Sequence, residues 1–172
     1  VDGDASAGGK VDRVDECDGL VRVIDYKTGN ISYTAEEYYA GVKLQLPLYL
    51  LAASKGKRPA GAYYFPANVE FGDKPAGDFT LKGFMDCGEE VVRNTDKTIK
   101  DKERSAFVDA YLNGRQLAGG LPEEDFSDFI AYSALIAKRG AKEMFGGNIA
   151  PSPFTGACDY CKMGGMCGFA AG

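Results

Sequence analysis

Two aspartates and a lysine, Asp12, Asp25 and Lys27, have the side-chain types and the spacing that hydrolytic chemistry needs. If the chain sets the two carboxylates face to face, they repel each other unless a positive group lies between them. A divalent cation held by oxygen ligands removes that repulsion, and a lysine beside it supplies a second positive charge. The three residues therefore predict a metal-dependent catalytic site, provided that one structural element brings them together.

A β-hairpin is the element expected to do so. The runs 10–17 and 20–27 alternate apolar and polar residues on either side of Asp18-Gly19. Asp-Gly between two such runs favours a type I′ turn, which needs positive φ at both positions. We therefore expect two antiparallel strands over 10–17 and 20–27.

The turn fixes which residues face each other across the two strands. Asp12 falls opposite Asp25, and Lys27 projects from the same face as Asp25 because side chains alternate along a strand. Two further pairs favour this register, namely Val14 with Val23 and Asp15 with the oppositely charged Arg22. The alternative is a solvated surface pair, or a longer turn with a different register, because a short pattern alone is only a hypothesis.

The hairpin resembles the core motifs of the RecB-like nucleases of the PD-(D/E)XK superfamily, on Gly-Lys-Val-Asp-Arg-Val-Asp at 9–15 and Val-Ile-Asp-Tyr-Lys-Thr-Gly at 23–29. Gln45-Leu-Pro-Leu-Tyr49 is similar to the Gln-x-x-x-Tyr motif of that group. Four residues apart on a helix, Gln45 and Tyr49 share one face, which by itself is typical of a core tyrosine with an incidental polar neighbour. The resemblance implies that both orient DNA or a catalytic group beside Lys27.

Three of the five cysteines, Cys158, Cys161 and Cys167, lie close together in a loop rich in Pro and Gly. Thiolates at this spacing suit zinc or an iron–sulfur cluster, and a disulfide with one free thiol is the remaining alternative. The segment resembles the iron–sulfur motif of AddB-type subunits of bacterial AddAB helicase–nucleases, which implies a [4Fe–4S] cluster. In that family the fourth cysteine precedes the nuclease motifs, and no cysteine precedes Asp12 here. Cys17 and Cys87 remain, but Cys17 lies at the hairpin end and matches no family ligand, so we expect the fourth cysteine outside these residues.

The composition limits the classes of function. One domain with a sizeable core is expected from 172 residues of which 45% are hydrophobic and 26% charged. A formal charge of −5 argues against a protein that coats nucleic acid through bulk charge, although an acidic metal site makes a nuclease look acidic. The absence of His excludes Ser-His-Asp triads and His-ligated zinc. No membrane segment or signal peptide is visible, so we expect a cytoplasmic location.

The resemblance implies an α/β fold with a restriction-endonuclease-like core, in which helices flank a mixed central sheet, followed by a cysteine-rich loop. Residues 1–9 are expected to be a flexible segment of a fragment, 10–150 the nuclease core and 151–172 the cysteine motif. The capping-box pattern Thr34–Glu37 predicts a helix to about Ser54, kinked at Pro47. Other expected elements are a strand over 60–66, a loop over 70–78, an extended segment over 79–84, a helix over 88–94, a strand over 105–112 and a helix over 122–145 that buries Phe126, Phe129, Ile130, Ile136 and Met144.

The function that the resemblance implies is Mg²⁺- or Mn²⁺-dependent DNA exonuclease activity in recombinational repair, during resection of double-strand breaks. Asp12, Asp25 and the backbone carbonyl of Tyr26 would hold the metal, and Lys27, Gln45 and Tyr49 would complete the catalytic set. Its partners would be single-stranded DNA and an AddA-type helicase–nuclease subunit. Many RecB-like nucleases add a His or Glu ligand from a preceding helix, which we expect upstream of Val1. The alternatives are a CRISPR-associated RecB-like exonuclease, or a non-catalytic interaction domain carrying zinc or a cluster.

Overall fold

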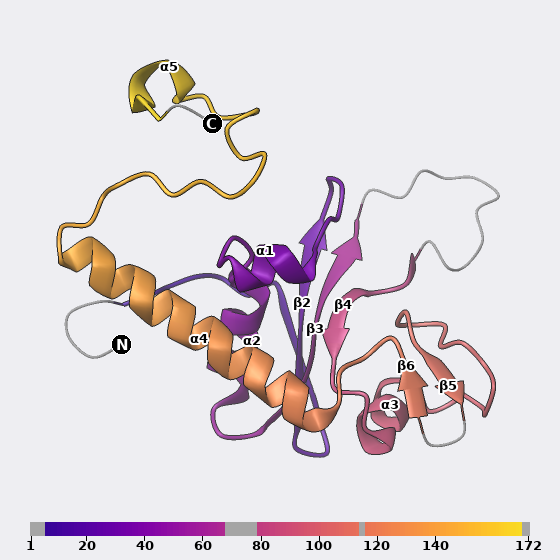
Figure 1. Ribbon diagram of the computed structural model, residues 1–172. Coiled ribbons are helices and arrows are strands. Elements are labelled where there is room, and N and C mark those ends of the chain that lie inside the picture. The colour runs from indigo at the N-terminus through magenta and orange to yellow at the C-terminus, as the bar shows by residue number, and fades with distance from the viewer. Residues whose placement is uncertain (1–5, 68–78, 114–115, 170–172) are drawn as a thin grey trace.

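A mixed four-stranded sheet lies at the centre of the computed structural model, which describes residues 6–67, 79–113 and 116–169 (Figure 1). Its strand order is β1-β2-β3-β4, with bounds Arg13–Cys17, Leu20–Lys27, Arg58–Pro66 and Lys82–Met85. The β1–β2 and β3–β4 pairs are antiparallel, whereas β2 and β3 are parallel. The expected α/β fold with a mixed central sheet is confirmed. No helix in the described part is long and apolar enough to cross a membrane.

The β1–β2 hairpin has the predicted register, with Val14 opposite Val23 and Asp15 opposite Arg22. Asp18 and Gly19 have φ values of 53° and 78°, as a type I′ turn requires. β1 begins at Arg13, three residues later than predicted. Asp15 and Arg22 face each other as predicted, but their side chains have other partners. Asp15 binds the neighbouring Arg13 at 2.8 Å. Arg22 donates to Asn94 Oδ1 at 2.6 Å, because helix α3 (Glu89–Thr95) lies within its reach.

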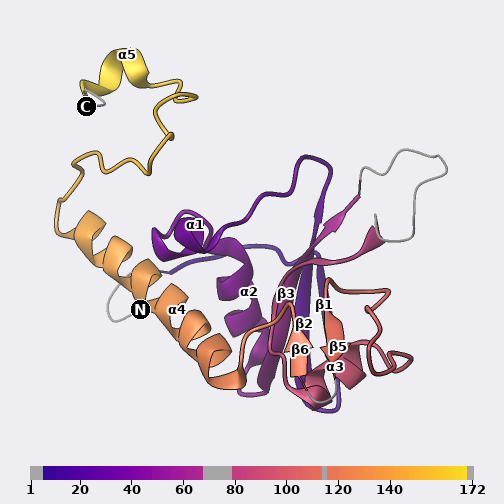
Figure 2. The ribbon, with the colours of Figure 1, turned by 45° about the vertical axis from the view of Figure 1, so that its right-hand side comes forward.

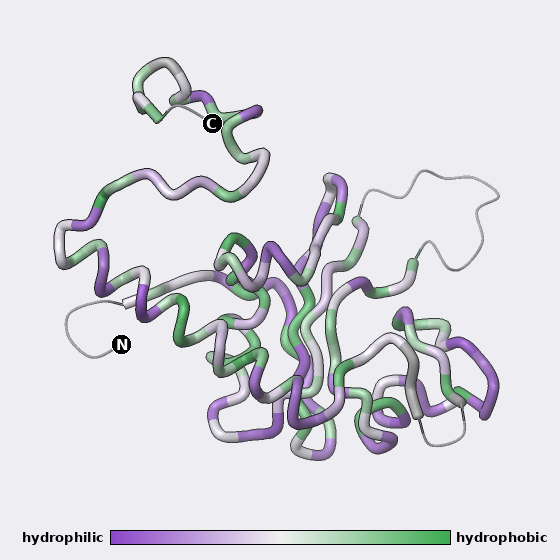
Figure 3. Tube along the Cα trace, viewed as in Figure 1, coloured by the Kyte–Doolittle hydropathy of each residue, from purple (hydrophilic) through white to green (hydrophobic). Residues whose placement is uncertain are grey.

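Both faces of the sheet are buried, which explains the long apolar runs of its parallel strands. Helices α1 (Ala35–Tyr39), α2 (Gln45–Ser54) and α4 (Glu123–Phe145) cover one face (Figure 2). Helix α3 covers the other face together with β5 (Tyr111–Asn113). Hydrophobic residues follow the central strands, whereas hydrophilic ones gather in the loops (Figure 3). Alternate residues of β2 serve the two cores, with Val23 facing the α1/α2/α4 side and Ile24 the α3 side. Asp25 and Lys27 therefore project toward the α1/α2/α4 side.

A β-bulge interrupts the pairing of β2 with β3. Val21 pairs with Pro59 but Arg22 pairs with Gly61, so that Ala60 is an extra residue on β3. After the bulge the strands stay in register, and Asp25 pairs with Tyr64.

The predicted single helix from Thr34 to Ser54 is wrong, because two helices occupy this segment. α1 spans Ala35–Tyr39, and its N-terminus has the predicted capping box of Thr34 and Glu37. α2 spans Gln45–Ser54. Pro47 does not kink a long helix but lies in the first turn of α2, where its missing N–H needs no partner and its ring clashes with no preceding turn.

The remaining elements follow in the order α3 (Glu89–Thr95), β5 (Tyr111–Asn113), β6 (Gln116–Ala118), α4 (Glu123–Phe145) and α5 (Gly164–Cys167). The helices predicted over 88–94 and 122–145 are confirmed within one residue at each end. α4 buries Phe126 and Ile130 as expected, but Met144 is 67% exposed because the last turns of α4 extend past the sheet. The predicted loop over 70–78 lies outside the described residues.

The strand predicted over 105–112 is wrong, since only Tyr111–Asn113 is a strand. The Ser105 hydroxyl accepts from the backbone N–H groups of Phe107 and Val108, and such local bonds compete with a strand ladder. Asp96, which is 2% exposed, accepts further hydrogen bonds from Ser105 at 2.8 Å and from the backbone N–H of Ala106 at 3.3 Å. Side-chain hydrogen bonds thus shape this irregular segment.

Asp96 should be a major source of stability on the α3 side. Burial alone would raise the pKa of Asp96, but hydrogen bonds from Thr98, Ser105 and Ala106 outweigh it and lower the pKa below its usual value. Asp96→Ala is expected to reduce the free energy of unfolding at pH 7 by about 2–4 kcal/mol, because several buried donors lose their acceptor. The exposed control Asp128→Ala should change the free energy of unfolding by no more than about 0.5 kcal/mol.

The pH dependence gives a second check on Asp96. Because its pKa is lower in the folded than in the unfolded state, its stabilisation is fully present above about pH 4 and is lost as pH falls through the folded pKa. Urea denaturation at pH 7 and near pH 3 should therefore show a smaller difference between wild type and Asp96→Ala at the lower pH. An undiminished difference would contradict this assignment.

Candidate active site

Asp25 and Lys27 form an ion pair at the C-terminal end of β2. Their Oδ2 and Nζ atoms lie 2.6 Å apart, and Asp25 is only 5% exposed whereas the Lys27 side chain is 39% exposed. The Asp25 carboxylate raises the pKa of Lys27 against the opposing effect of burial. Lys27 is therefore charged at neutral pH and neutralises a carboxylate that burial would otherwise destabilise.

Asp12 lies beside this pair, at the entrance to the hairpin. Its Oδ2 accepts the backbone N–H of Tyr26 at 3.1 Å, which places its carboxylate next to the residue between Asp25 and Lys27. Its negative charge also contributes to the raised pKa of Lys27. The structure thus brings Asp12, Asp25, Tyr26 and Lys27 together, with Asp12 exposed and Asp25 buried.

Helix α2 adds the two polar residues of the Gln-x-x-x-Tyr segment. Gln45, the first residue of α2, donates from Nε2 to Asp25 Oδ1 at 3.4 Å and to the Tyr49 hydroxyl at 3.3 Å. These two long hydrogen bonds link Tyr49 through Gln45 to the buried carboxylate. Gln45 and Tyr49 are consequently placed to orient Asp25.

Tyr64 is a site residue that the sequence reasoning missed. Its ring lies below the Lys27 ammonium, with 5.5 Å between Nζ and the ring centroid, and it is 5% exposed. A cation over a tyrosine face is attracted by the ring quadrupole. The sequence feature that could have indicated Tyr64 is the aromatic run Tyr63-Tyr64-Phe65, on the strand that pairs with Asp25.

The donor set suits a hard divalent cation. Asp25 Oδ2 is buried and accepts no hydrogen bond of regular geometry, although the Lys27 ammonium lies close to it. A buried carboxylate oxygen paired with an ammonium, with a second carboxylate nearby, is the type of ligand that Mg²⁺ and Mn²⁺ prefer. Among the described residues, however, no group of three or more His, Cys, Asp and Glu side chains could hold a metal. Asp12 and Asp25 would therefore bind it with fewer protein ligands than a closed site has.

The three C-terminal cysteines do not form a metal site in the described structure. Cys158, Cys161 and Cys167 all have free thiols, and they do not converge into a group that could hold a metal. They lie in a segment that leads away from the end of α4, with Cys167 at the end of α5 (Figure 1). The arrangement does not fit a cluster bound by these three residues alone.

Comparisons with known proteins identify the family. The model of the PD-(D/E)XK nuclease superfamily matches residues 5–168. The chain is 31% identical to an ATP-dependent helicase/deoxyribonuclease subunit of Caldanaerobacter subterraneus subsp. tengcongensis, over 94% of this chain and 16% of that protein. It is 28% identical to the proteins of the same name from Alkaliphilus metalliredigens and Clostridioides difficile, over 94% of this chain and 17% of each.

The chain thus spans less than a fifth of the length of these relatives. The family match covers the hairpin with Asp12, Asp25 and Lys27 as well as the C-terminal cysteines. The chain belongs to the PD-(D/E)XK nuclease superfamily.

Proposed function

We propose that this domain hydrolyses DNA phosphodiester bonds with the help of Mg²⁺ or Mn²⁺. The observation that carries the proposal is the grouping of Asp12, Asp25 and Lys27 around the backbone of Tyr26, with the Asp25 carboxylate buried and paired with the Lys27 ammonium. A buried carboxylate beside a lysine, open to solvent on the Asp12 side, suits metal binding and phosphate contact together.

Each residue of the site has a separate role in the proposed reaction. Asp12, Asp25 and the backbone carbonyl of Tyr26 would hold the cation, which when bound polarises the phosphate and lowers the pKa of a water molecule. Lys27, whose pKa is raised, stays protonated and stabilises the negative charge that develops on the phosphate oxygens. Gln45 and Tyr49 orient Asp25, and the Tyr64 ring holds the ammonium from below.

We further propose that the domain acts as the exonuclease of a helicase–nuclease complex in double-strand break resection, in the cytoplasm. The names of the relatives, which join helicase and deoxyribonuclease, support a helicase context and a DNA substrate. An AddA-type subunit would be its partner and would deliver single-stranded DNA. Delivery by a partner agrees with the formal charge of −5, which does not favour capture of DNA by charge.

The cysteines extend the proposal to a structural [4Fe–4S] cluster. Cys158, Cys161 and Cys167 would supply three ligands, and a cysteine outside these 172 residues the fourth. Binding would order the segment after α4 against the nuclease core, because metal ligation couples to folding. A further metal ligand for the catalytic site would also come from outside the chain.

Asp25→Asn tests the catalytic proposal. Loss of the buried negative charge should lower the rate of single-stranded DNA cleavage in Mg²⁺ at least about a hundredfold, whereas Asp128→Asn should leave it unchanged. The assay follows an end-labelled oligonucleotide with the complete helicase–nuclease complex, and circular dichroism checks that both variants are folded. Equal cleavage by Asp25→Asn and wild type would sink the nuclease assignment.

Lys27→Met tests whether the Asp25 carboxylate binds a cation in place of the lysine. Without the ammonium, the Asp25 carboxylate has no counter-charge in the metal-free protein, which should lose about 1–2 kcal/mol of stability, a value reduced because Lys27 is 39% exposed. Since the pKa of Lys27 is raised in the folded state, its stabilisation is fully present below about pH 10 and is lost as pH rises through the folded pKa.

Thermal denaturation near neutral pH provides the measurement. Mg²⁺ should raise Tm more in Lys27→Met than in wild type, because the cation no longer competes with the lysine for Asp25. Lys57→Met, which removes an exposed lysine paired with Glu16, is the matched control and should respond like wild type. Equal Mg²⁺ shifts in all three proteins would argue against a cation at Asp25.

The cluster has its own test. The full-length protein, purified without oxygen, should contain iron and acid-labile sulfide in about equal amounts, and replacement of Cys161 by Ser should remove both. Zinc without sulfide would replace the cluster by a zinc site, and neither metal would leave the cysteines without this role.

A further inference from the structure

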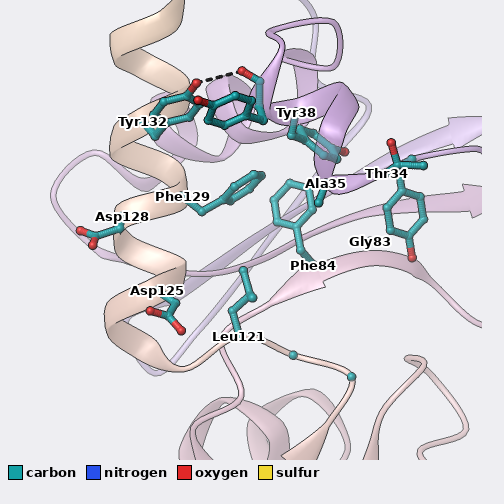
Figure 4. A pocket seen from close by; sticks show the side chains of 14 residues that line it. Thr34, Ala35, Tyr38, Gly83, Phe84, Leu121, Asp125, Asp128, Phe129 and Tyr132 are labelled. Carbon is teal, nitrogen blue, oxygen red and sulfur yellow. Dashed lines mark hydrogen bonds between the residues drawn. The ribbon is translucent and has the colours of Figure 1, made fainter. Parts of the chain in front are cut away.

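A cavity of about 620 Å³ opens on the same face of the sheet as Asp25 (Figure 4). It lies between α1, α4, the middle of β4 and the turn at 119–121. This volume is in the range of sites that bind ligands or side chains of a partner. The catalytic residues Asp12, Asp25 and Lys27 do not line it, so the cavity is a second concave site of the described structure.

Aromatic rings form most of its wall. Phe84 of β4 and Phe129 of α4 pack edge to face at 4.5 Å between centroids, and Tyr38 packs against both. At its upper end Tyr39 and Tyr132 are stacked, with 6° between the rings and 5.5 Å between the centroids. The Tyr132 hydroxyl donates to the Tyr39 carbonyl at 2.9 Å, the dashed line in Figure 4. Tyr39 is nevertheless 74% exposed, so this stack has an open face.

The charge of the cavity has one sign. The residues that line it include Asp125 and Asp128 but neither Lys nor Arg. Asp125 belongs to the acidic first turn of α4, together with Glu123 and Glu124. In Figure 4 the Asp128 carboxylate points away from the aromatic rings, whereas Asp125 lies at the end near Leu121.

The open Tyr39–Tyr132 stack and the negative charge of Asp125 together favour a basic occupant. Exposed tyrosine faces attract Arg and Lys through cation–π contacts, and the Asp125 carboxylate adds Coulomb attraction. Single-stranded DNA also stacks on tyrosine, but its phosphates need cations that the wall of this cavity lacks. A peptide with an apolar side chain and a neighbouring cation is complementary to both features, because the apolar side chain packs on Phe84 and Phe129 and the cation binds Asp125.

We propose that this cavity docks a segment of a partner protein in which an apolar side chain is flanked by Arg or Lys. The apolar side chain packs on Phe84 and Phe129, and the cation lies over the Tyr39–Tyr132 stack or against Asp125. The inference does not rest on the proposed nuclease chemistry, because none of these residues takes part in it.

A tryptophan peptide provides the test, since the chain contains no Trp and the fluorescence of the peptide reports its binding alone. The probe is an Arg-Leu-Trp-Leu-Arg peptide, and its control is Glu-Leu-Trp-Leu-Glu with the same apolar centre. The 172-residue chain should bind the Arg peptide and bind the Glu peptide at least about tenfold more weakly. Asp25→Asn should bind the Arg peptide like wild type, so failure of the nuclease assignment leaves this test intact.

Variants locate the binding site. Asp125→Lys should weaken the Arg peptide about tenfold and Tyr39→Ala about fivefold, while Asp128→Lys, with the same change of charge but a side chain turned away, should have little effect. All three positions are exposed, and circular dichroism checks their folding. Absence of binding, equal binding of both peptides, or equal effects of Asp125→Lys and Asp128→Lys would overturn the proposal. Competition by an oligothymidine that is lost in Tyr39→Ala would also overturn it, in favour of a DNA subsite.

Discussion

The candidate active site depends on one ion pair, between Asp25 and Lys27 at the end of β2. A carboxylate that is 5% exposed stays ionised only where a positive charge or several donors compensate for lost hydration. Lys27 supplies that charge, Gln45 supplies a weak donor, and the Tyr64 ring supports the lysine. Strand β2, helix α2 and strand β3 thus each contribute a residue that compensates for the buried charge of Asp25 or supports the lysine.

The same arrangement connects folding to chemistry. In the metal-free protein the lysine stands where positive charge is needed, so the site is stable before a cation arrives. A cation that binds Asp25 would release the ammonium toward solvent, where a phosphate could meet it. In the proposed mechanism, the buried carboxylate that is costly for stability is also the group that would bind the cation.

Much of the fold and of the candidate site was predictable from the sequence, because local interactions determine it. The hairpin register followed from Asp18-Gly19, because a two-residue turn fixes every pair in the strands that it joins. The Thr34 capping box was predictable for the same reason. The resemblance to RecB-like nucleases gave the fold class, which the sheet and the family match confirm. Roles for the individual site residues remain predictions.

Contacts other than strand pairing account for most of what the sequence did not predict. Arg22 lies opposite Asp15 as predicted, but it donates to Asn94, far along the chain, and no pairing rule for hairpins could show this. The strand expected at 105–112 gave way to hydrogen bonds that the Ser105 hydroxyl donates to Asp96 and accepts from the backbone N–H of Phe107. Tyr64 was missed because its place beside Asp25 depends on a parallel pairing and on the bulge in β3. The convergence of the cysteines could not be judged from spacing alone.

The bulge at Ala60 also limits how this domain can change. Parallel partners project to the same face, so the extra residue decides that Tyr64, and not Tyr63, underlies the lysine. Loss of one residue between Arg58 and Tyr64 would turn the aromatic pair over, placing each ring in the opposite core. In homologous domains with the same candidate site, we therefore expect insertions and deletions in the loops. The number of residues from Arg58, where β3 begins, to Tyr64 should stay the same.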